Sequence, residues 1–334
     1  MTKIPSTKII LIANVNSTFV KKDEKAFLEK AMVLKMICAM PKNFAHFIIE
    51  QFKILVFMLK NVHRSQAVVC WFADYHSFFP AMMAKLFSKP FYLVLGGYDT
   101  TYLPELDYGV YSNRLRSYMV DYAIKNTTLN LPVSNFLAEE LNKRYQNTIK
   151  VEVLPTGYTV DATGPFEKEK SVLTVAHVNT VKRLLIKGID RFIALATAMP
   201  EISFTVIGVK EGLLKSYNLP DNLQCLEVLP KLEVNEYYKK AKVYCQFSIR
   251  EGLPNAVFEA MSYACVVIGM NHSGIAEAMD DTGYLLDKWD VNDAINLVNL
   301  ALEDRTKGSE GKTRVKKYFN EDFRKNRLFK ILEL

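Results

Sequence analysis

The stretch Arg250–Gly269, REGLPNAVFEAMSYACVVIG, constrains the prediction of the fold more than any other part of the chain. The apolar run Val243–Phe247 before it predicts a buried strand. A helix is expected to begin near Pro254 or Asn255, because proline suits the first position of a helix. Gly252 in the short loop between them would let the backbone come close to a ligand. The loop amides and the helix N-terminus together favour an anion such as a nucleotide diphosphate.

We call this predicted strand, loop and helix start the Glu251 corner, and it carries two carboxylates. Glu251 lies at the start of the loop, and Glu259 lies eight positions later in the expected helix. Carboxylates accept hydrogen bonds from neighbouring hydroxyl groups, so one could hold a sugar and the other a ribose. The structural alternative is a first-turn acid favoured by the helix dipole at Glu251 and a surface residue at Glu259. That alternative does not explain an acid in the middle of the apolar run AVFEAMSYACVV, so the binding interpretation is preferred.

On both sides of this corner, short apolar runs alternate with longer helical patterns. Such runs predict strands buried on both faces, and the alternation predicts parallel sheets wound in right-handed βαβ units. The stretch Leu154–Lys170 lacks periodicity and carries Pro, Gly and charges, so two Rossmann-like domains are expected to join there. We place the domains at 1–155 and 165–310, with a last helix over 311–334. The predicted strands are Ile9–Val15, Ala67–Phe72, Phe91–Leu95, Val172–Ala176, Phe204–Gly208, Val243–Phe247 and Val266–Gly269.

Composition narrows the class of protein. Of the 334 residues, 49% are hydrophobic and 24% are charged, which is typical of a globular protein and excludes a disordered chain, a collagen-like repeat and a disulfide scaffold. The net charge of +7 favours acidic partners such as phosphates or a membrane surface. The Lys/Arg pattern is not dense enough for a dedicated nucleic-acid binder, so no nucleic acid is expected.

Three features predict a cytoplasmic protein. The five cysteines are far apart among apolar neighbours and form no Cys-x-x-Cys, so they are expected to be reduced, buried thiols. The basic N-terminus precedes only a short apolar run, Ile9–Val15, which predicts a first strand and not a signal peptide. No stretch reaches the roughly 18 uncharged apolar residues of a membrane span.

Two segments are more basic than the rest. Lys30–Arg64 has six basic residues and one acid, a net charge of +5, and its part Phe44–Leu59 predicts a helix that is apolar on almost every face. The composition favours a helix buried between the sheet and its neighbours, and the alternative is in-plane contact with an anionic membrane surface. Lys312–Leu334 predicts a basic amphipathic helix that covers a core with one face.

The blocks EGLPN, EAMSYACVVIG and HSGIAEAMDDTGYLL resemble, in this order, the donor-binding half of the family-4 glycosyltransferases, also named glycosyl transferases group 1. Cys265-Val266 stand where that family usually has Gly-x-Pro, which should affect packing and not chemistry. The resemblance implies the α/β fold GT-B, in which the parallel sheets of two Rossmann-like domains face each other across a cleft. It also implies an acceptor-binding first domain, a donor-binding second domain, and a last helix that crosses back to the first.

The same resemblance gives a role to the segment Val172–Ala196, which is similar to the family's strand–loop–helix that supplies basic groups to the donor diphosphate. Lys187 precedes a glycine and matches the family's lysine, and Arg183, with Lys182 as its rival, is the candidate for the family's arginine. With the amides of Leu253–Asn255, these cations would stabilise the leaving diphosphate as its charge grows. The alternative is an exposed basic loop, which is disfavoured beside the pair of glutamates.

In the N-terminal half, the loop Leu95-Gly96-Gly97-Tyr98-Asp99 resembles the family's V-H-G-x-D, and Gly96 stands where many members carry a histidine. The two glycines would permit close approach of the backbone to the reacting sugar. Asp99 could orient the acceptor hydroxyl or cap a turn, and these two roles stay open. His76 could line the same cleft, although a buried histidine with satisfied hydrogen bonds is favoured.

No metal site is expected, because there is no Asp-x-Asp and the five histidines are scattered. The resemblance therefore implies a retaining, metal-independent hexosyltransferase without a cofactor, with a UDP- or GDP-sugar as donor. The acceptor would be a glycan or a lipid-linked glycan in surface polysaccharide biosynthesis, and the protein would be cytoplasmic or peripheral at the inner face of the cell membrane. The alternatives are a sugar-nucleotide epimerase of the same fold and a non-catalytic module that binds nucleotide sugars.

Overall fold

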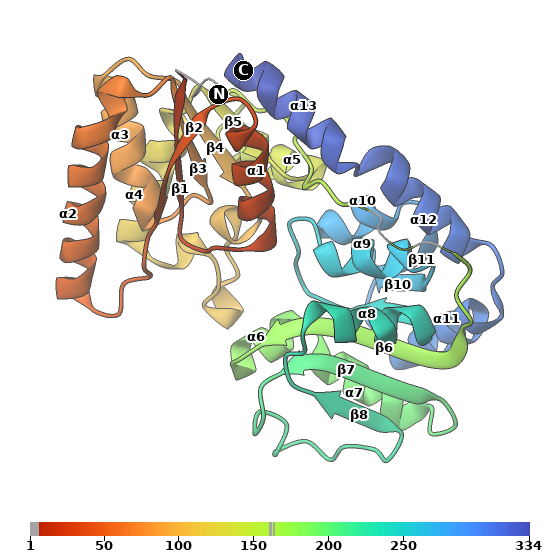
Figure 1. Ribbon diagram of the computed structural model, residues 1–334. Coiled ribbons are helices and arrows are strands. Elements are labelled where there is room, and N and C mark those ends of the chain that lie inside the picture. The colour runs from red at the N-terminus through yellow and green to blue at the C-terminus, as the bar shows by residue number, and fades with distance from the viewer. Residues whose placement is uncertain (1–6, 160–161, 163) are drawn as a thin grey trace. The chain divides into compact units, whose positions relative to one another are not determined.

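The computed structural model describes residues 7–159, 162 and 164–334, and they form two compact units (Figure 1). The first unit contains the chain up to Gly157 together with Glu321–Leu334, and the second contains Tyr158–Asn320. Each unit is built on one parallel sheet. No helix among the described residues is both long enough and apolar enough to cross a membrane.

The first unit has a five-stranded sheet in the order β2-β1-β3-β4-β5. The helices α2, α3 and α4 cover one face of this sheet, and α1 and α13 lie on the other (Figure 1). The order in which the chain adds strands reverses between the neighbours β1 and β3. From β1 the chain continues to β2 at one edge, and from β3 it continues through β4 to β5 at the other edge. The strands are β1 (Lys8–Ala13), β2 (Met32–Ile37), β3 (Ala67–Trp71), β4 (Phe91–Leu95) and β5 (Leu129–Pro132); the helices are α1 (Thr18–Leu28), α2 (Phe44–Asn61), α3 (Phe78–Leu86), α4 (Arg114–Lys125), α5 (Asn135–Arg144) and α13 (Glu321–Leu332).

The second unit has a six-stranded sheet in the order β11-β10-β9-β6-β7-β8. The helices α7 and α11 pack on one face, and α8, α9 and α12 pack on the other. The strands are β6 (Glu169–Val178), β7 (Ser203–Val209), β8 (Leu223–Leu226), β9 (Ala241–Gln246), β10 (Val266–Met270) and β11 (Gly283–Leu286); the helices are α6 (Val181–Ile186), α7 (Ile189–Ala198), α8 (Lys231–Lys240), α9 (Asn255–Ser262), α10 (Ser273–Met279), α11 (Val291–Glu303) and α12 (Lys307–Tyr318).

All seven predicted strands are strands, and they are the seven interior strands of the two sheets. The strands β2, β5, β8 and β11, which are the edge strands of the two sheets, were not predicted from the sequence. An interior strand is covered on both faces and therefore forms an uninterrupted apolar run. An edge strand such as β2, MVLKMI, is partly exposed along its length and includes a lysine, so its pattern is weaker.

Two helix predictions need correction. The single helix expected over 311–334 is two helices, because α12 ends at Tyr318 and α13 begins at Glu321. Only α13 belongs to the first unit, while α12 packs on α9 in the second. The helix expected to be buried between sheet and neighbours, α2, buries one face only, and its other face carries large exposed apolar side chains.

A buried ion pair fixes α13 to the first unit. Arg324 Nη2 lies 2.7 Å from Asp23 Oδ2 on α1, and the two side chains are 4% and 2% exposed. Arg324 Nη1 also donates to the carbonyls of Leu154 and Pro155, at 2.8 and 3.0 Å. Trp71 Nε1 donates to the same Asp23 carboxylate at 2.8 Å. The C-terminal helix is therefore held by charge and hydrogen bonds as well as by apolar packing.

The cysteines follow the expectation in four cases. Cys38, Cys70, Cys245 and Cys265 are buried free thiols, and burial raises the pKa of each. Cys225, on the edge strand β8, is a free thiol that is only partly buried. The expectation of a buried thiol is therefore wrong for Cys225.

Candidate functional site

In the sheet of the second unit, the order in which strands are added reverses between the neighbours β6 and β9. From β6 the chain moves to β7 and β8 on one side, and from β9 it moves to β10 and β11 on the other. In parallel α/β sheets, ligands bind outside the carboxyl ends of the strands at such a switch point. The segment Thr180–Lys187 follows β6, and Ser248–Asn255 follows β9. The two segments that the sequence analysis singled out therefore meet at this point.

Lys187 and Glu251 form an ion pair at the switch point. Lys187 Nζ lies 2.5 Å from Glu251 Oε1, and the side chains are 22% and 14% exposed. Gly188 makes this approach possible, because it has a φ of +66° and a Cβ there would lie 2.2 Å from the carbonyl oxygen of Phe247. The Ile249 amide also donates to the Ile186 carbonyl at 2.8 Å, which joins the two segments directly.

Behind Glu251 a chain of buried polar side chains leads into the sheet. Ser248 Oγ donates to Glu251 Oε1 at 2.8 Å, and Gln246 Nε2 donates to Ser248 Oγ at 2.6 Å. Tyr244 OH in turn donates to Gln246 Oε1 at 2.8 Å, which fixes the amide orientation. Glu251 Oε2 accepts no hydrogen bond from the described residues, so this oxygen remains available to a ligand.

The loop after Glu251 packs against the start of α10. The Gly274 amide donates to the Glu251 carbonyl at 3.1 Å, and a Cβ at Gly274 would lie 1.9 Å from the carbonyl oxygen of Gly252. The Glu251 amide donates to Ser273 Oγ at 3.3 Å. The predicted row of amide donors over Leu253–Asn255 needs correction, because Pro254 has no N–H group. Within Leu253–Asn255, only Leu253 and Asn255 carry a backbone N–H group.

Glu259 and Arg183 do not share this ion pair. Glu259, on α9, pairs with Lys231 through Oε1 and accepts from Tyr238 OH through Oε2 at 3.2 Å. Both carboxylate oxygens of Glu259 therefore have a partner, and the Lys231 side chain is 53% exposed. Arg183 lies in the first turn of α6, exposed, and its amide donates to Thr180 Oγ1. Its guanidinium forms no ion pair within the described part of the chain.

In the first unit, Asp99 lies after β4 and caps a turn. Its carboxylate accepts from the amides of Gly97 at 2.7 Å, Gly96 at 3.0 Å and Ala73 at 3.3 Å, and the residue is 1% exposed. Burial raises the pKa of Asp99 to about 6, although the three amides favour the ionised form. The carboxylate is occupied by the backbone, which is the turn-capping alternative. A role toward an acceptor hydroxyl stays a prediction.

At Gly96 the ring of Phe72 lies where a side chain would be. A Cβ at Gly96 would lie 2.2 Å from Cε1 of Phe72, so the Phe72 ring occupies the space of a side chain there. Phe72 has a φ of +68°, which is unusual for a bulky residue. His76 is 3% exposed, its Nε2 lies 2.9 Å from the Trp71 carbonyl oxygen, and burial lowers its pKa. His76 is thus a buried residue with a hydrogen-bond partner, which agrees with the interpretation favoured from the sequence.

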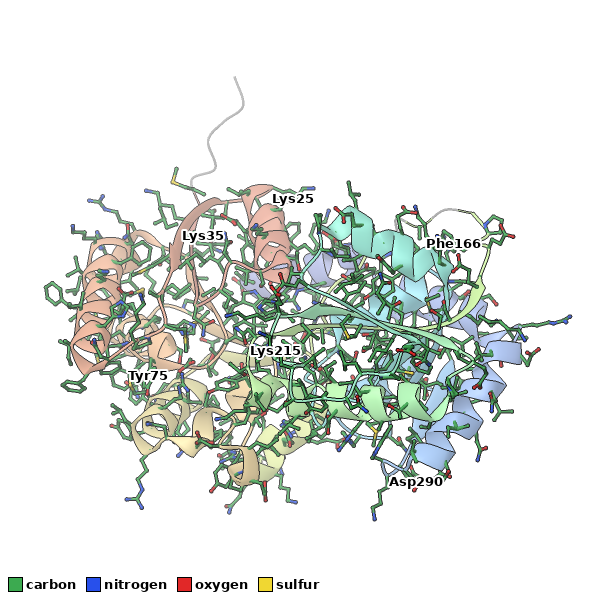
Figure 2. The ribbon with its side chains drawn as sticks, turned by 90° about the horizontal axis from the view of Figure 1, so that it is seen from below. Lys25, Lys35, Tyr75, Phe166, Lys215 and Asp290 are labelled. Carbon is green, nitrogen blue, oxygen red and sulfur yellow. The ribbon has the colours of Figure 1, made fainter. Side chains whose placement is uncertain are left out.

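Tyr98 belongs to a separate cluster in the first unit. Arg116 Nη1 donates to Tyr98 OH at 2.7 Å, while Arg116 Nε lies 2.7 Å from the buried Asp74. The guanidinium also lies over the ring of Tyr75, which is labelled in Figure 2. Through Tyr98, this cluster fixes the same turn after β4 that the Asp99 carboxylate caps.

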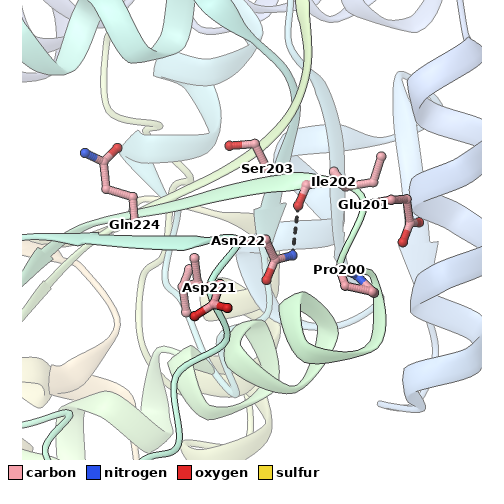
Figure 3. A pocket seen from close by; sticks show the side chains of 8 residues that line it. Pro200, Glu201, Ile202, Ser203, Asp221, Asn222 and Gln224 are labelled. Carbon is pink, nitrogen blue, oxygen red and sulfur yellow. Dashed lines mark hydrogen bonds between the residues drawn. The ribbon is translucent and has the colours of Figure 1, made fainter.

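A hollow of about 380 Å³ in the second unit is a poor alternative site. Pro200–Ser203 and Asp221–Gln224 line it, at the amino ends of β7 and β8 (Figure 3). Ligands of parallel sheets bind at the carboxyl ends, which is the opposite edge. The two N–H groups of Asn222 Nδ2 are already taken, because three carbonyl oxygens lie within hydrogen-bond distance of this nitrogen, including that of Ile202 at 2.8 Å.

The second unit is similar to known glycosyltransferases. Residues 161–321 match the model of the family described as Glycosyl transferases group 1, so the resemblance seen in the sequence is confirmed over this part of the chain. An uncharacterized glycosyltransferase of Haemophilus influenzae is 24% identical over 151 residues, which are 41% of this chain and 40% of the relative. The amylovoran biosynthesis glycosyltransferase AmsD of Erwinia amylovora is 35% identical over 75 residues, 22% of this chain and 21% of the relative. The matches thus span less than half of these relatives.

Solved structures resemble the whole chain. Sucrose-phosphate synthase from Thermosynechococcus elongatus has a TM-score of 0.81 at 15% identity, with 98% of both chains covered. HepE from Anabaena, solved in complex with UDP-glucose, has a TM-score of 0.76 at 12% identity, with 98% of this chain and 99% of that chain covered. At these identities the likeness shows the fold, which is GT-B: two parallel-sheet α/β units.

Proposed function

We propose that this protein is a glycosyltransferase that moves a hexosyl group from a nucleotide-diphosphate sugar to a glycan or lipid-linked acceptor, because residues 161–321 match the model of the glycosyl transferases group 1 family. The observation that carries the proposal is the Lys187–Glu251 pair at the switch point of the second sheet. This pair offers a cation and a carboxylate oxygen side by side, where a ligand of such a sheet is expected.

The two residues would act on different parts of the donor. Glu251 Oε2 would accept hydrogen bonds from sugar hydroxyls, while Ser248 and Gln246 hold Oε1 in place. Lys187 would exchange part of its contact with Glu251 for the diphosphate. As the bond between the sugar carbon and the phosphate oxygen breaks, charge grows on the phosphate, and Lys187 with Arg183 stabilises it. These two cations would supply the positive charge, so we propose a transfer that needs no metal.

The proposed transfer retains the configuration of the sugar. The acceptor oxygen forms its bond to the sugar carbon as the phosphate leaves, and the acceptor proton passes to the leaving phosphate. No carboxylate of the first unit has to act as base in this scheme. This agrees with Asp99, whose carboxylate is held by three backbone amides.

Two further assignments belong to the proposal. The donor would be a UDP- or GDP-sugar, supported by the UDP-glucose held by the similar fold of HepE. The acceptor would be part of surface polysaccharide biosynthesis at the inner face of the cell membrane, supported by the name of the relative AmsD and by the apolar outer face of α2. The first unit would bind this acceptor, and Glu259 would hold the donor ribose.

The test begins with a thermal-shift screen of UDP-, GDP-, ADP- and dTDP-sugars on the full chain, because a ligand at 100 times its Kd adds about 2.7 kcal/mol of stability. With the donor found, release of nucleoside diphosphate is measured with acceptor glycans and lipid-linked glycans. Glu251→Gln should lower kcat/KM by about 10²–10³, as for the loss of a polar group that acts in the transition state. Glu236→Gln, which changes an exposed glutamate of the same unit, should leave it unchanged.

Other outcomes would overturn the proposal. An epimeric sugar formed from donor and enzyme alone would show an epimerase. Donor binding without any turnover in the presence of acceptors would show a binding module. Equal kcat/KM for Glu251→Gln and Glu236→Gln would show that the site lies elsewhere.

A further inference from the structure

The helix α2 presents its apolar side to the solvent. Five large apolar side chains on it are exposed: Phe44 73%, Phe52 65%, Ile49 52%, Ile48 50% and Leu59 48%. The side packed on the sheet buries Ile54 and Met58, but it also buries Glu50 and Gln51. The usual order of a surface helix, with polar residues outside and apolar ones inside, is therefore partly reversed.

The exposed side chains form one strip along the helix. Positions 44, 48, 52 and 59 recur at spacings of four and seven, which in a helix with 3.6 residues per turn places them on one side. At 1.5 Å per residue the strip from Phe44 to Leu59 is roughly 22 Å long. Figure 2 shows side chains of α2 that point away from the rest of the first unit. A continuous exposed apolar strip of this kind marks an interaction surface.

The charges beside the strip are positive. Lys42, Lys53 and Lys60 are exposed. The one acid between Lys30 and Arg64 is Glu50, which is 5% exposed and faces inward. Glu50 accepts from Lys53 Nζ at 2.6 Å and from the Ala39 amide at 3.3 Å, and the contact with Lys53 lowers its pKa. The outer side of α2 therefore combines the apolar strip with the cations Lys42 and Lys60, while the charge of Lys53 is paired with Glu50.

We propose that α2 lies in the plane of an anionic lipid membrane, with the strip from Phe44 to Leu59 inserted at the level of the headgroups. Apolar side chains flanked by lysines bind such a surface through burial and through attraction to anionic headgroups. A second copy of this chain fits the same face less well, because it would bring further lysines and no exposed acid on α2 to pair with them. The inference goes beyond sugar transfer and stands independently of the donor site.

The test uses co-sedimentation of the full chain with vesicles of phosphatidylcholine alone and of equal parts phosphatidylcholine and phosphatidylglycerol. We expect binding to the anionic vesicles that is at least tenfold tighter than to the neutral ones, and that weakens in high salt. Phe52→Glu should reduce binding to the anionic vesicles at least tenfold. Phe323→Glu is the matched control, because Phe323 is 59% exposed on α13 in the same unit. Thermal unfolding and donor binding should match the wild type in both variants.

Three results would overturn the inference. The first is equal binding of both vesicle types, or of neither. The second is equal binding by Phe52→Glu and Phe323→Glu. The third is a dimer in light-scattering measurements without lipid that Phe52→Glu abolishes, which would assign the face to a second copy. Loss of membrane binding with unchanged donor binding would leave the transferase proposal untouched, so the failures of the two are distinguishable.

Discussion

Replacement of Arg324 by methionine tests how the C-terminal helix is held in the first unit. Met keeps most of the side-chain volume but removes every donor. Among the described residues, Asp23, 2% exposed, would keep the Trp71 indole as its remaining side-chain partner, and the carbonyls of Leu154 and Pro155 would lose the Arg324 donor. A carboxylate left buried without its cation costs about 3–5 kcal/mol.

The assay is urea unfolding followed by tryptophan fluorescence. The chain has two tryptophans, and Trp71 lies under the Arg324 guanidinium, 5.0 Å from ring centre to Cζ. A Trp289→Phe background leaves Trp71 as the reporter of the first unit. In thermal unfolding, the same loss should lower Tm by roughly 6–20 °C for a unit of this size.

Lys325→Met is the matched control on the same helix. Lys325 pairs with Glu29 at 3.5 Å near the surface, and its loss should leave the unfolding midpoint close to that of the wild type. The double variant Asp23→Leu, Arg324→Met should recover most of the loss, because no buried charge then remains unpaired. Equal midpoints for Arg324→Met and Lys325→Met would refute the reasoning.

Three further outcomes are expected. Lys187→Ala should weaken the binding of the nucleoside diphosphate at least tenfold while the nucleoside keeps its affinity in calorimetric titration, and equal losses would contradict a contact with the diphosphate. Ser248→Ala should lower the free energy of unfolding of the second unit by about 0.5–1.5 kcal/mol, measured through Trp289, because it removes the shorter of the two hydrogen bonds that the buried Gln246 amide donates and leaves only the one to Glu251 at 3.3 Å; an unchanged value would speak against the polar chain. Since the pKa of Asp99 is raised to about 6 from an ordinary 3.8, its folded form binds the proton more tightly than the unfolded chain does. We therefore compare the free energies of unfolding of the wild type and of Asp99→Asn as a function of pH. The difference in favour of the wild type should be greatest below pH 4 and should fall as the pH rises to about 6. A difference that grows with pH would show that the amides outweigh burial.

The corner of the second unit could be predicted because its information is local. A buried strand, a short loop with glycine and proline, and a helix start follow one another within Val243–Ser262, and each leaves its own pattern. The helix start at Asn255 agrees with the prediction. Ser248, Gln246 and Tyr244 were missed, although their alternation along β9 and its loop was a signal: three polar groups at every second position of an otherwise apolar run.

Which face of α2 packs on the sheet could not be predicted from its composition. A helix that is apolar on almost every face has no periodicity to show which side meets the sheet. In the fold the one acid of this segment, Glu50, faces inward, where Lys53 and the Ala39 amide satisfy it. The packed neighbours decided the orientation, and with it the exposed strip.

The sequence by itself determined the seven interior strands and the Glu251 corner, because burial on both faces and the start of a helix constrain consecutive residues. Only the tertiary structure decided the edge strands, the outer face of α2 and the partners of the charged groups. Lys187 meets Glu251 across 64 positions, and Arg324 meets Asp23 across 301. Contacts at such separations depend on how the strands are ordered in the sheets and how the helices pack on them, and residue spacing along the chain carries no record of either.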